Sequence, residues 1–253
     1  MDSNSQIKGR LIILSGPSCV GKTPLARAFA KLHPQINNAL QKVILYNSRN
    51  LRPNETDGID YNFRKRKDIE KMRKRKLFLV MKVRDDLQAL DIKELLKQLH
   101  EGDVFFEGNT FIGKKLLSHP KLKDIEKLSI FLSPLSKSEM LNLKSSPANI
   151  NLADFITEMM RMKLLNRAKK YNQELTSSTL ENINKRAADA YEELKFAWQF
   201  DYVISNRDGE DSKNWQHITQ SASDAYKALQ TFTLLLIGEK PKLAEKWPEN
   251  LLN

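Results

Sequence analysis

The sequence predicts an α/β fold with one large core and attached subdomains. Residues 11–32 have the pattern of a buried strand, a glycine-rich turn and an amphipathic helix. Two further apolar strands are expected at 103–107 and 128–135, and an amphipathic helix at 92–100 precedes the first of them. With 253 residues, of which 40% are hydrophobic and 29% charged, the chain is long enough to bury such a core.

The first strand and the first helix have the clearest patterns. The strand is the continuous apolar run LIIL at 11–14. The helix carries its apolar residues at the spacing of a single face, at Leu25, Ala28, Phe29 and Leu32. A strand followed directly by an amphipathic helix is the repeating unit of α/β folds.

The turn between them, GPSCVGKT at 16–23, fits the phosphate-binding loop G-x-x-x-x-G-K-[ST]. Gly16 and Gly21 allow backbone angles that a side chain would forbid, so successive N–H groups can point at a phosphate. The next helix adds the positive end of its dipole. Lys22 supplies a charge for the terminal phosphates, and the Thr23 hydroxyl is a ligand for Mg²⁺. The predicted nucleotide-binding residues are Gly16, Pro17, Ser18, Cys19, Val20, Gly21, Lys22, Thr23 and Pro24.

Composition limits the class of protein. No apolar run approaches the roughly 18 residues of a membrane span, and residues 1–10 lack the apolar core of a secretion signal. The single cysteine, Cys19, excludes an internal disulfide and fits a reducing compartment. We therefore expect a cytoplasmic protein without a membrane partner. The net charge of +11 favours polyanionic partners without choosing among them.

A second motif, SRNLRPNETDGIDYNF, covers residues 48–63. Arg49 and Arg52 stand three apart before a turn, and Glu55 and Tyr61 follow. Two guanidinium forks and a phenol near a turn can form a receptor for a second phosphate. A solvated polar loop is the alternative interpretation.

Together, the two motifs resemble those of the guanylate kinase family, which carries a GPSGxGKS/T loop and a TTRxPRxxExxGxxYxF segment. The residues that match the second pattern are Ser48, Arg49, Arg52, Pro53, Glu55, Gly58, Tyr61 and Phe63. The resemblance implies a P-loop NTPase fold, a doubly wound parallel sheet with an acceptor-binding subdomain and a mobile lid. It also implies phosphoryl transfer from ATP, with Mg²⁺, to a nucleoside monophosphate. GMP or dGMP, giving GDP or dGDP, is the first expectation for the acceptor.

The resemblance implies a single kinase domain over residues 1–253 with three parts. Its expected divisions are a core of 10–44, 101–135 and 187–240, an acceptor-binding subdomain of 45–100, and a lid with an insertion at 136–186. Residues 1–9 are expected to be disordered, a short strand is expected at 43–46, a closing helix at 221–237, and a tail at 238–253.

The sequence departs from the family pattern where the family reads guanine. Val80 stands where the family has a glutamate, Gln88 where it has a second phosphate-gripping tyrosine, and Leu45 where it has a hydroxyl residue. Polar residues of the same segment, Arg84 and Gln88 among them, could read the acceptor base by hydrogen bonds or belong to a surface loop. Both interpretations stay open.

Two strand ends add candidates through the same resemblance. Glu107 and Asn109 loosely match the family's Asp-x-Asp near the acceptor and the water shell of the metal. An acid at the carboxyl end of a parallel strand lies where α/β sites form. Asn206 ends the strand FDYVIS and would lie beside the donor base.

The expected lid supplies the last candidates. Arg167, with Lys169 or Lys170, and Arg186 match the family's lid arginines, which close on the donor phosphates and on the charge that develops in transfer. Exposed basic residues on a helix are the alternative for the two lysines.

Residues 64–76 hold nine basic and two acidic residues. We expect a solvated helix face rather than a nucleic-acid contact, because the run lacks interleaved aromatic residues.

Two other functions of the chain stay open. One is a related kinase with a different phosphorylated acceptor, such as another nucleotide, a sugar phosphate or a nucleic-acid end. The other is a guanylate kinase-like binding module without catalysis, which ATP binding that depends on Lys22 would exclude.

Overall fold

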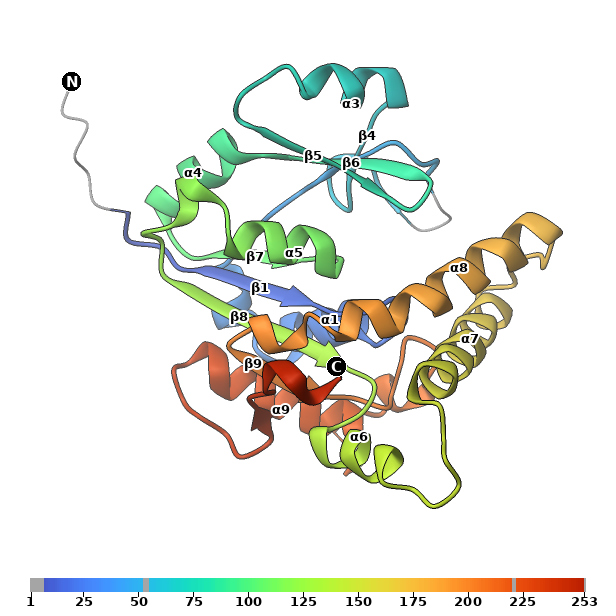
Figure 1. Ribbon diagram of the computed structural model, residues 1–253. Coiled ribbons are helices and arrows are strands. Elements are labelled where there is room, and N and C mark those ends of the chain that lie inside the picture. Colours follow the sequence, from blue (N-terminus) through green and yellow to red (C-terminus); the bar gives the residue numbers. More distant parts are fainter. Residues whose placement is uncertain (1–6, 52–54, 220–221, 253) are drawn as a thin grey trace, which may run out of the picture. The chain divides into compact units, whose positions relative to one another are not determined.

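Strands and helices alternate along the chain in the computed structural model, which describes residues 7–51, 55–219 and 222–252 (Figure 1). The chain divides into two units. Unit 1 comprises 1–12, 39–106 and 124–127, and unit 2 comprises 13–38, 107–123 and 128–253. Among the described residues, no helix combines the length and the apolar character that crossing a membrane requires.

The strands are β1 (Leu11–Ser15), β2 (Gln41–Lys42), β3 (Tyr46–Asn47), β4 (Asn62–Phe63), β5 (Phe78–Val83), β6 (Asp86–Asp91), β7 (Val104–Glu107), β8 (Lys127–Ser133), β9 (Tyr202–Ser205) and β10 (Ala244–Glu245). The helices are α1 (Lys22–Leu32), α2 (Pro34–Asn38), α3 (Arg66–Met72), α4 (Ile92–Glu101), α5 (Thr110–Leu117), α6 (Lys137–Lys144), α7 (Leu152–Lys170), α8 (Ser177–Leu194) and α9 (Asp224–Leu236). The strands expected near 11–14, 103–107 and 128–135 and the helices expected near 92–100 and 221–237 are therefore confirmed.

The larger sheet has the strand order β10-β9-β8-β1-β7-β2, and the boundary between the units runs through β1 and β7. Strand β8 pairs in parallel with β9, and β2 pairs in parallel with β7. Strand β10 runs antiparallel to β9 and adds an edge strand to the expected doubly wound parallel sheet. All five residues of β1 are buried, as expected for a strand covered on both faces.

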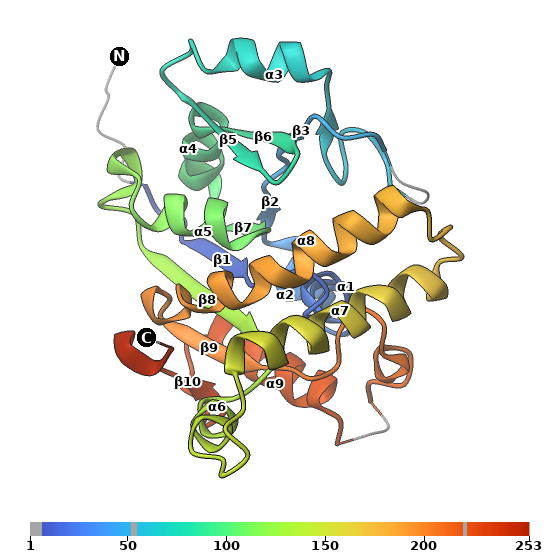
Figure 2. The ribbon, with the colours of Figure 1, turned by 45° about the vertical axis from the view of Figure 1, so that its right-hand side comes forward.

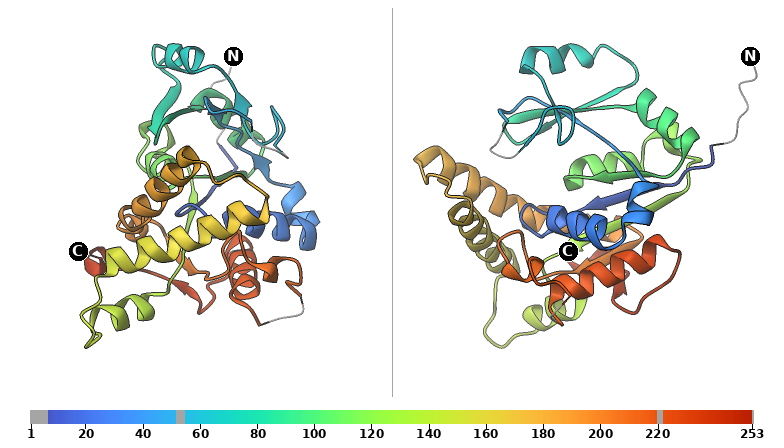
Figure 3. Two further views of the ribbon diagram at one scale, coloured as in Figure 1. Left: turned by 90° about the vertical axis from the view of Figure 1, so that its right-hand side faces the viewer. Right: turned by 180° about the vertical axis from the view of Figure 1, so that it is seen from behind.

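Unit 2 packs helices of distant sequence against one another. Helix α1 buries Leu25, Ala28 and Phe29, and the Phe29 ring meets Phe232 of α9 edge-on with ring centroids 5.3 Å apart. Leu32, the last residue of the expected apolar face, is 37% exposed because the helix ends there. Helices α7 and α8 lie side by side as a long pair (Figures 2 and 3).

Unit 1 contains a smaller sheet in the order β4-β3-β6-β5, in which β5 and β6 form a hairpin. Helix α3 covers one face of this sheet (Figure 1). Its Ile69 forms a buried cluster with Leu87 and Ala89 of β6, and Val80 of β5 packs against the cluster. The basic residues of α3 therefore remain on its exposed side, and their solvated role stays a prediction.

The strand expected at 43–46 is wrong in its position. The backbone N–H of Val43 donates to the Phe105 carbonyl at 2.9 Å and so extends the β2–β7 pairing. Tyr46 instead begins β3 and pairs with Ala89 of the smaller sheet. The apolar residues at 43 and 45 are buried while the chain passes from one sheet to the other, which explains the strand-like pattern.

The predicted acceptor-binding subdomain, 45–100, falls within unit 1, and the predicted lid, 136–186, falls within unit 2. The division into core, subdomain and lid stays a prediction. Residues 1–6 of the expected disordered start lie outside the described residues.

The expected tail at 238–253 is not a tail over the part that the structure describes. Its backbone pairs with β9 through β10, which covers an edge that would otherwise present unpaired groups. Trp247, Leu251 and Leu252 are buried, and the Trp247 Nε1 donates to Glu245 Oε2 at 2.7 Å. The segment contains enough apolar surface to pack against the core. Its two prolines favoured the interpretation as a tail.

We expect Trp247→Ala to lower the free energy of unfolding by about 3 kcal/mol, since a large buried aromatic side chain is lost. Denaturant unfolding followed by circular dichroism measures this change. Leu243→Ala is the control, because Leu243 is 54% exposed and its truncation should change the free energy by less than about 0.5 kcal/mol. Equal effects of the two substitutions would show that the C-terminal segment does not contribute to the core.

Candidate active site

The phosphate loop joins β1 to α1 and has the backbone that its glycines were expected to allow. The φ angles of Gly16 and Gly21 are 143° and 101°. A Cβ on Gly21 would lie 2.5 Å from Nδ2 of Asn206, so a side chain is excluded there by contact as well as by conformation. Cys19 also has a positive φ, of 68°, at the position where the family pattern has glycine.

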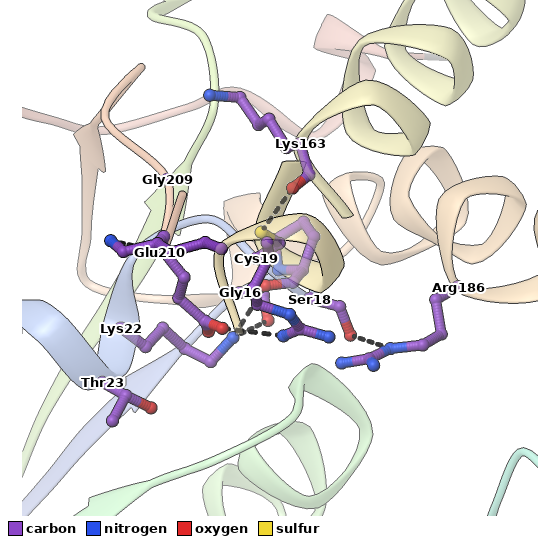
Figure 4. A network of polar contacts seen from close by, with 12 residues as sticks. Gly16, Ser18, Cys19, Lys22, Thr23, Lys163, Arg186, Gly209 and Glu210 are labelled. Atoms are coloured by element: carbon purple, nitrogen blue, oxygen red, sulfur yellow. Dashed lines mark hydrogen bonds and ion pairs between the residues drawn. The ribbon is translucent and has the colours of Figure 1, made fainter. Parts of the chain in front are cut away.

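Lys22 is buried at the first turn of α1 and is held by the loop itself. Its Nζ donates to the carbonyls of Gly16 at 2.8 Å and Pro17 at 2.7 Å (Figure 4). Burial lowers the pKa of Lys22, and the charge of Glu193 is the largest influence that opposes this. The ammonium is therefore positioned before any ligand arrives.

Thr23 lies beside an acidic strand end. Its Oγ1 donates to Oε1 of Glu107, the last residue of β7, at 2.7 Å. A hydroxyl and a carboxylate are the hard oxygen ligands that Mg²⁺ prefers. Among the described residues, no three or more His, Cys, Asp or Glu side chains gather as a metal site. Thr23 and Glu107 are thus two residues that could hold Mg²⁺.

Asn109 follows this strand end and begins the next helix. Its Oδ1 accepts a hydrogen bond from the backbone N–H of Ile112 at 3.0 Å, which caps α5. Glu107 thus lies at the phosphate loop, whereas the capping contact gives Asn109 a structural role. Its role toward the acceptor stays a prediction.

The two predicted lid arginines both come from the long helical pair. Arg186 of α8 reaches the phosphate loop, where its Nε donates to the Ser18 Oγ at 3.2 Å (Figure 4). Arg167 of α7 forms an ion pair with Glu210, with Nη1 and Oε2 2.7 Å apart. Burial alone would lower the pKa of Arg167, but Glu210 outweighs it and raises that pKa.

The two predicted lid lysines differ from each other. Lys170 donates from Nζ to the carbonyls of Glu210 at 3.0 Å and Ser212 at 3.3 Å. Lys169 is exposed on the same helix. Both lysines are exposed, and only Lys170 is tied to the segment after β9. Their role toward the donor phosphates stays a prediction.

Two carboxylates near Lys22, one buried and one half-buried, were missed by the sequence reasoning. Glu193 of α8 is 1% exposed and accepts a hydrogen bond from the Thr110 Oγ1 at 2.6 Å. It is in phase with the apolar stripe of α8, three residues after the buried Ala190, and this position was a usable signal. Glu210 follows β9 in an irregular segment, where no periodic signal exists.

Asn206 is buried and occupied by contacts within the protein. Its Nδ2 donates to the carbonyls of Val20 at 2.8 Å and Asp208 at 2.7 Å, and its Oδ1 accepts from the Asp208 backbone N–H. These bonds tie the phosphate loop to the segment after β9. A contact of Asn206 with the donor base stays a prediction.

The acceptor motif in unit 1 is built around Arg49. Its guanidinium forms two bonds with the Glu55 carboxylate, at 2.6 Å and 2.5 Å. The same group lies over the rings of Tyr61 and Phe63, 5.2 Å from each centroid. The structure thus gathers three of the predicted acceptor residues. Arg52, the fourth, lies outside the described residues.

At the positions where the family recognises guanine, this chain has apolar residues or residues that belong to the β5–β6 hairpin. Val80 packs on the α3 side of the smaller sheet, and Leu45 is buried. Arg84 lies in the turn of the β5–β6 hairpin with a φ of 58°. Gln88 is 9% exposed and pairs with Asn47 in the smaller sheet. Of the polar candidates in this segment, Gln88 therefore has the most enclosed surroundings.

We expect the Cys19 thiol to react slowly with thiol reagents. Burial, with the charge of Glu210 next, raises its pKa from 9.0 to about 11, and its Sγ donates to the Lys163 carbonyl at 3.4 Å. Below pH 9 the thiolate fraction is about 100-fold smaller than for an ordinary thiol. The reactivity of the thiol is measured as its rate of reaction with a chromogenic disulfide at mildly alkaline pH. The rate of the native protein is compared with that of the denatured protein. A native rate equal to the denatured one would contradict the burial of the thiol.

Comparison with known proteins agrees with this geometry. The family described as guanylate kinase matches residues 8–158. The guanylate kinase of Rickettsia bellii (strain RML369-C) is 28% identical over 207 residues, covering 81% of this chain and 90% of that protein. That of Bacillus anthracis is 30% identical over 201 residues, covering 79% and 81%. The crystal structure of guanylate kinase from Anaplasma phagocytophilum superposes with a TM-score of 0.54 and 15% identity, covering 98% and 95%, and supports the fold. The chain belongs to the guanylate kinase family.

Proposed function

We propose that the protein is an ATP-dependent guanylate kinase, which transfers the terminal phosphoryl group of ATP to GMP or dGMP. The observation that carries this proposal is the preformed phosphate loop, with Lys22 fixed inside it, in a member of this family. The relatives that match most of the chain are named guanylate kinases. We infer ATP and GMP as the small-molecule partners and, from the single cysteine, a cytoplasmic location.

The residues around the phosphate loop supply charge and position for the donor. An oxygen of the acceptor phosphate attacks the terminal phosphorus, and the bond to the oxygen that leaves with ADP breaks. Lys22 would hold the terminal phosphate, while Arg186 and Arg167 would neutralise charge as it moves to the leaving oxygen. Mg²⁺, held by Thr23 beside Glu107, would neutralise the donor phosphates. Closure of the lid, 136–186, would keep water from the reacting phosphate.

The acceptor motif would hold the phosphate of GMP. The Glu55 carboxylate and the rings of Tyr61 and Phe63 fix the Arg49 guanidinium, so little conformational freedom is lost when it binds a phosphate. We infer that the enclosed amide of Gln88 contributes to recognition of the acceptor, because a site that selects by hydrogen bonds needs a buried polar group.

Arg49→Ala should raise the KM for GMP by roughly 10- to 100-fold, the effect of losing hydrogen bonds to a charged group. The KM for ATP should change far less, because the donor residues are untouched. Steady-state kinetics with each substrate varied in turn gives both values. The control is Arg73→Ala, which removes the same charge from an exposed ion pair with Glu70. Equal increases in both KM values would remove Arg49 from the acceptor site.

The proposed reaction forms one GDP for each ADP, and measuring this ratio tests the proposal. Chromatography of a mixture of the protein, ATP, Mg²⁺ and GMP should show equal amounts of ADP and GDP formed. Chelation of the metal should stop both. ADP without GDP would indicate hydrolysis of ATP, and neither product, with ATP bound through Lys22, would indicate a kinase with an acceptor other than GMP.

A further inference from the structure

The carboxylate of Glu210 lies among the cations of the donor site. Its side chain is 19% exposed, and its ion-pair partner Arg167 is 14% exposed. Figure 4 shows the carboxylate pointing toward the ammonium of Lys22, with Arg186 at the same loop. An acid in the place where a nucleotide kinase binds polyphosphate requires an explanation, because like charges repel.

The segment that carries Glu210 rests directly on the phosphate loop. The Glu210 backbone N–H donates to the Cys19 carbonyl at 3.3 Å. A Cβ on Gly209 would lie 2.4 Å from the same carbonyl oxygen, so glycine is needed for this close approach. The Trp215 Nε1 donates to the Gly209 carbonyl at 2.9 Å. The contact is therefore built into the backbone of the segment.

Helix α7 holds the other side of this segment through its basic residues. Lys170 donates to the Glu210 carbonyl at 3.0 Å, and Lys163 donates to the carbonyl of Arg207. The Arg167 guanidinium binds the carboxylate itself. The cation that would otherwise be free to bind a donor phosphate is thus paired within the protein.

The charge on Glu210 is maintained by its neighbours. Burial works to raise the pKa of Glu210, but the charge of Arg167, followed by those of Lys22 and Arg186, outweighs it and lowers that pKa. The carboxylate is therefore ionised at neutral pH. It offsets part of the positive charge of these three cations.

We propose that Glu210 is an internal anion that sets the affinity of the donor site, because its carboxylate occupies the cations that the phosphates of ATP require. This inference rests on the proposed function of the phosphate loop. ATP binding displaces the carboxylate from Arg167 and moves the segment around Gly209. The affinity for ATP is therefore lower than it would be if these cations were unpaired. In the protein without ATP, Glu210 keeps the cations paired.

Glu210→Gln tests the proposal, because it removes the charge and keeps an oxygen that can accept from Arg167. Titration calorimetry with ATP and Mg²⁺, and with inorganic tripolyphosphate, should show binding about tenfold tighter than in the wild type, the change from one lost like-charge interaction. The gain should shrink as salt is added. Glu210→Asp keeps the charge and should bind like the wild type. Glu239→Gln, which removes the same charge from an exposed position after α9, should change nothing.

Weaker or unchanged binding by Glu210→Gln would overturn the proposal, because the carboxylate would then position Arg167 or have no effect. A wild type that binds neither ATP nor tripolyphosphate, like Lys22→Ala, would instead overturn the proposed function. The two failures are thus distinguishable.

A second measurement uses the wild-type chain and does not depend on how the variant folds. Because Trp215 is bonded to the same segment, tripolyphosphate should change the intrinsic fluorescence, and Trp215→Phe should lose that change. If tripolyphosphate saturates both proteins and the fluorescence change is the same in the wild type and in Trp215→Phe, the proposed displacement is wrong. Tripolyphosphate is used because it has no base that could quench the indole.

Discussion

Lys22→Ala is expected to reduce phosphoryl transfer to GMP by at least about 10³-fold, since it removes the main fixed charge at the transferred group. The structure explains why the effect should be large. The Lys22 ammonium is buried and held by two loop carbonyls, and no other lysine side chain among the described residues of the loop can replace it. The rate of ADP formation, coupled to oxidation of a reduced nicotinamide, measures the effect.

The control for this variant is Lys31→Ala, which removes a lysine from the exposed last turn of the same helix. It should keep wild-type activity. Circular dichroism and a thermal melt should show that Lys22→Ala is folded. Activity that survives in folded Lys22→Ala would remove the phosphate loop from the mechanism.

Arg186→Ala is expected to have the second large effect, a loss of about 10³-fold in kcat, the lower end of the range for arginines that stabilise phosphoryl transfer. Its guanidinium already contacts the loop through Ser18, so it is positioned for charge that develops there. The Kd for ATP should change much less than kcat, because this interaction strengthens in the transition state. Single-turnover kinetics together with calorimetry separate the two quantities.

Arg161→Ala is the matched control for Arg186→Ala. Arg161 is a half-buried arginine on the other helix of the pair and bonds to Glu158 and Asn184. Its loss should leave kcat unchanged. A large loss in ATP affinity with kcat preserved in Arg186→Ala would assign Arg186 to ground-state binding alone.

The elements that could be predicted from the sequence are those whose signal is local. The phosphate loop needs glycine at two backbone positions, and the apolar run before it and the apolar stripe after it each mark one element. Arg49, Glu55 and Tyr61 are close in sequence, so their spacing was enough to predict that they gather.

The features that escaped prediction depend on contacts between distant residues. Glu210 meets Arg167, 43 residues earlier, from a segment without periodicity. The buried C-terminal segment was mistaken for a tail because its packing depends on the edge of β9. Val80 faces the α3 cluster, and only the strand register shows this. Propensity and spacing carry no information on such contacts.

The most direct test of the account is the initial rate of ADP release with ATP and Mg²⁺ against GMP, dGMP, AMP, CMP, UMP and dTMP, with Lys22→Ala as the blank. We expect rates with GMP and dGMP at least about 100-fold above the others, as for a site that selects its acceptor by hydrogen bonds. A preference for another monophosphate would contradict the assigned acceptor. It would indicate that the apolar residues at 45 and 80 change the acceptor specificity. No turnover on any of the six, with ATP still bound, would contradict the proposed function itself.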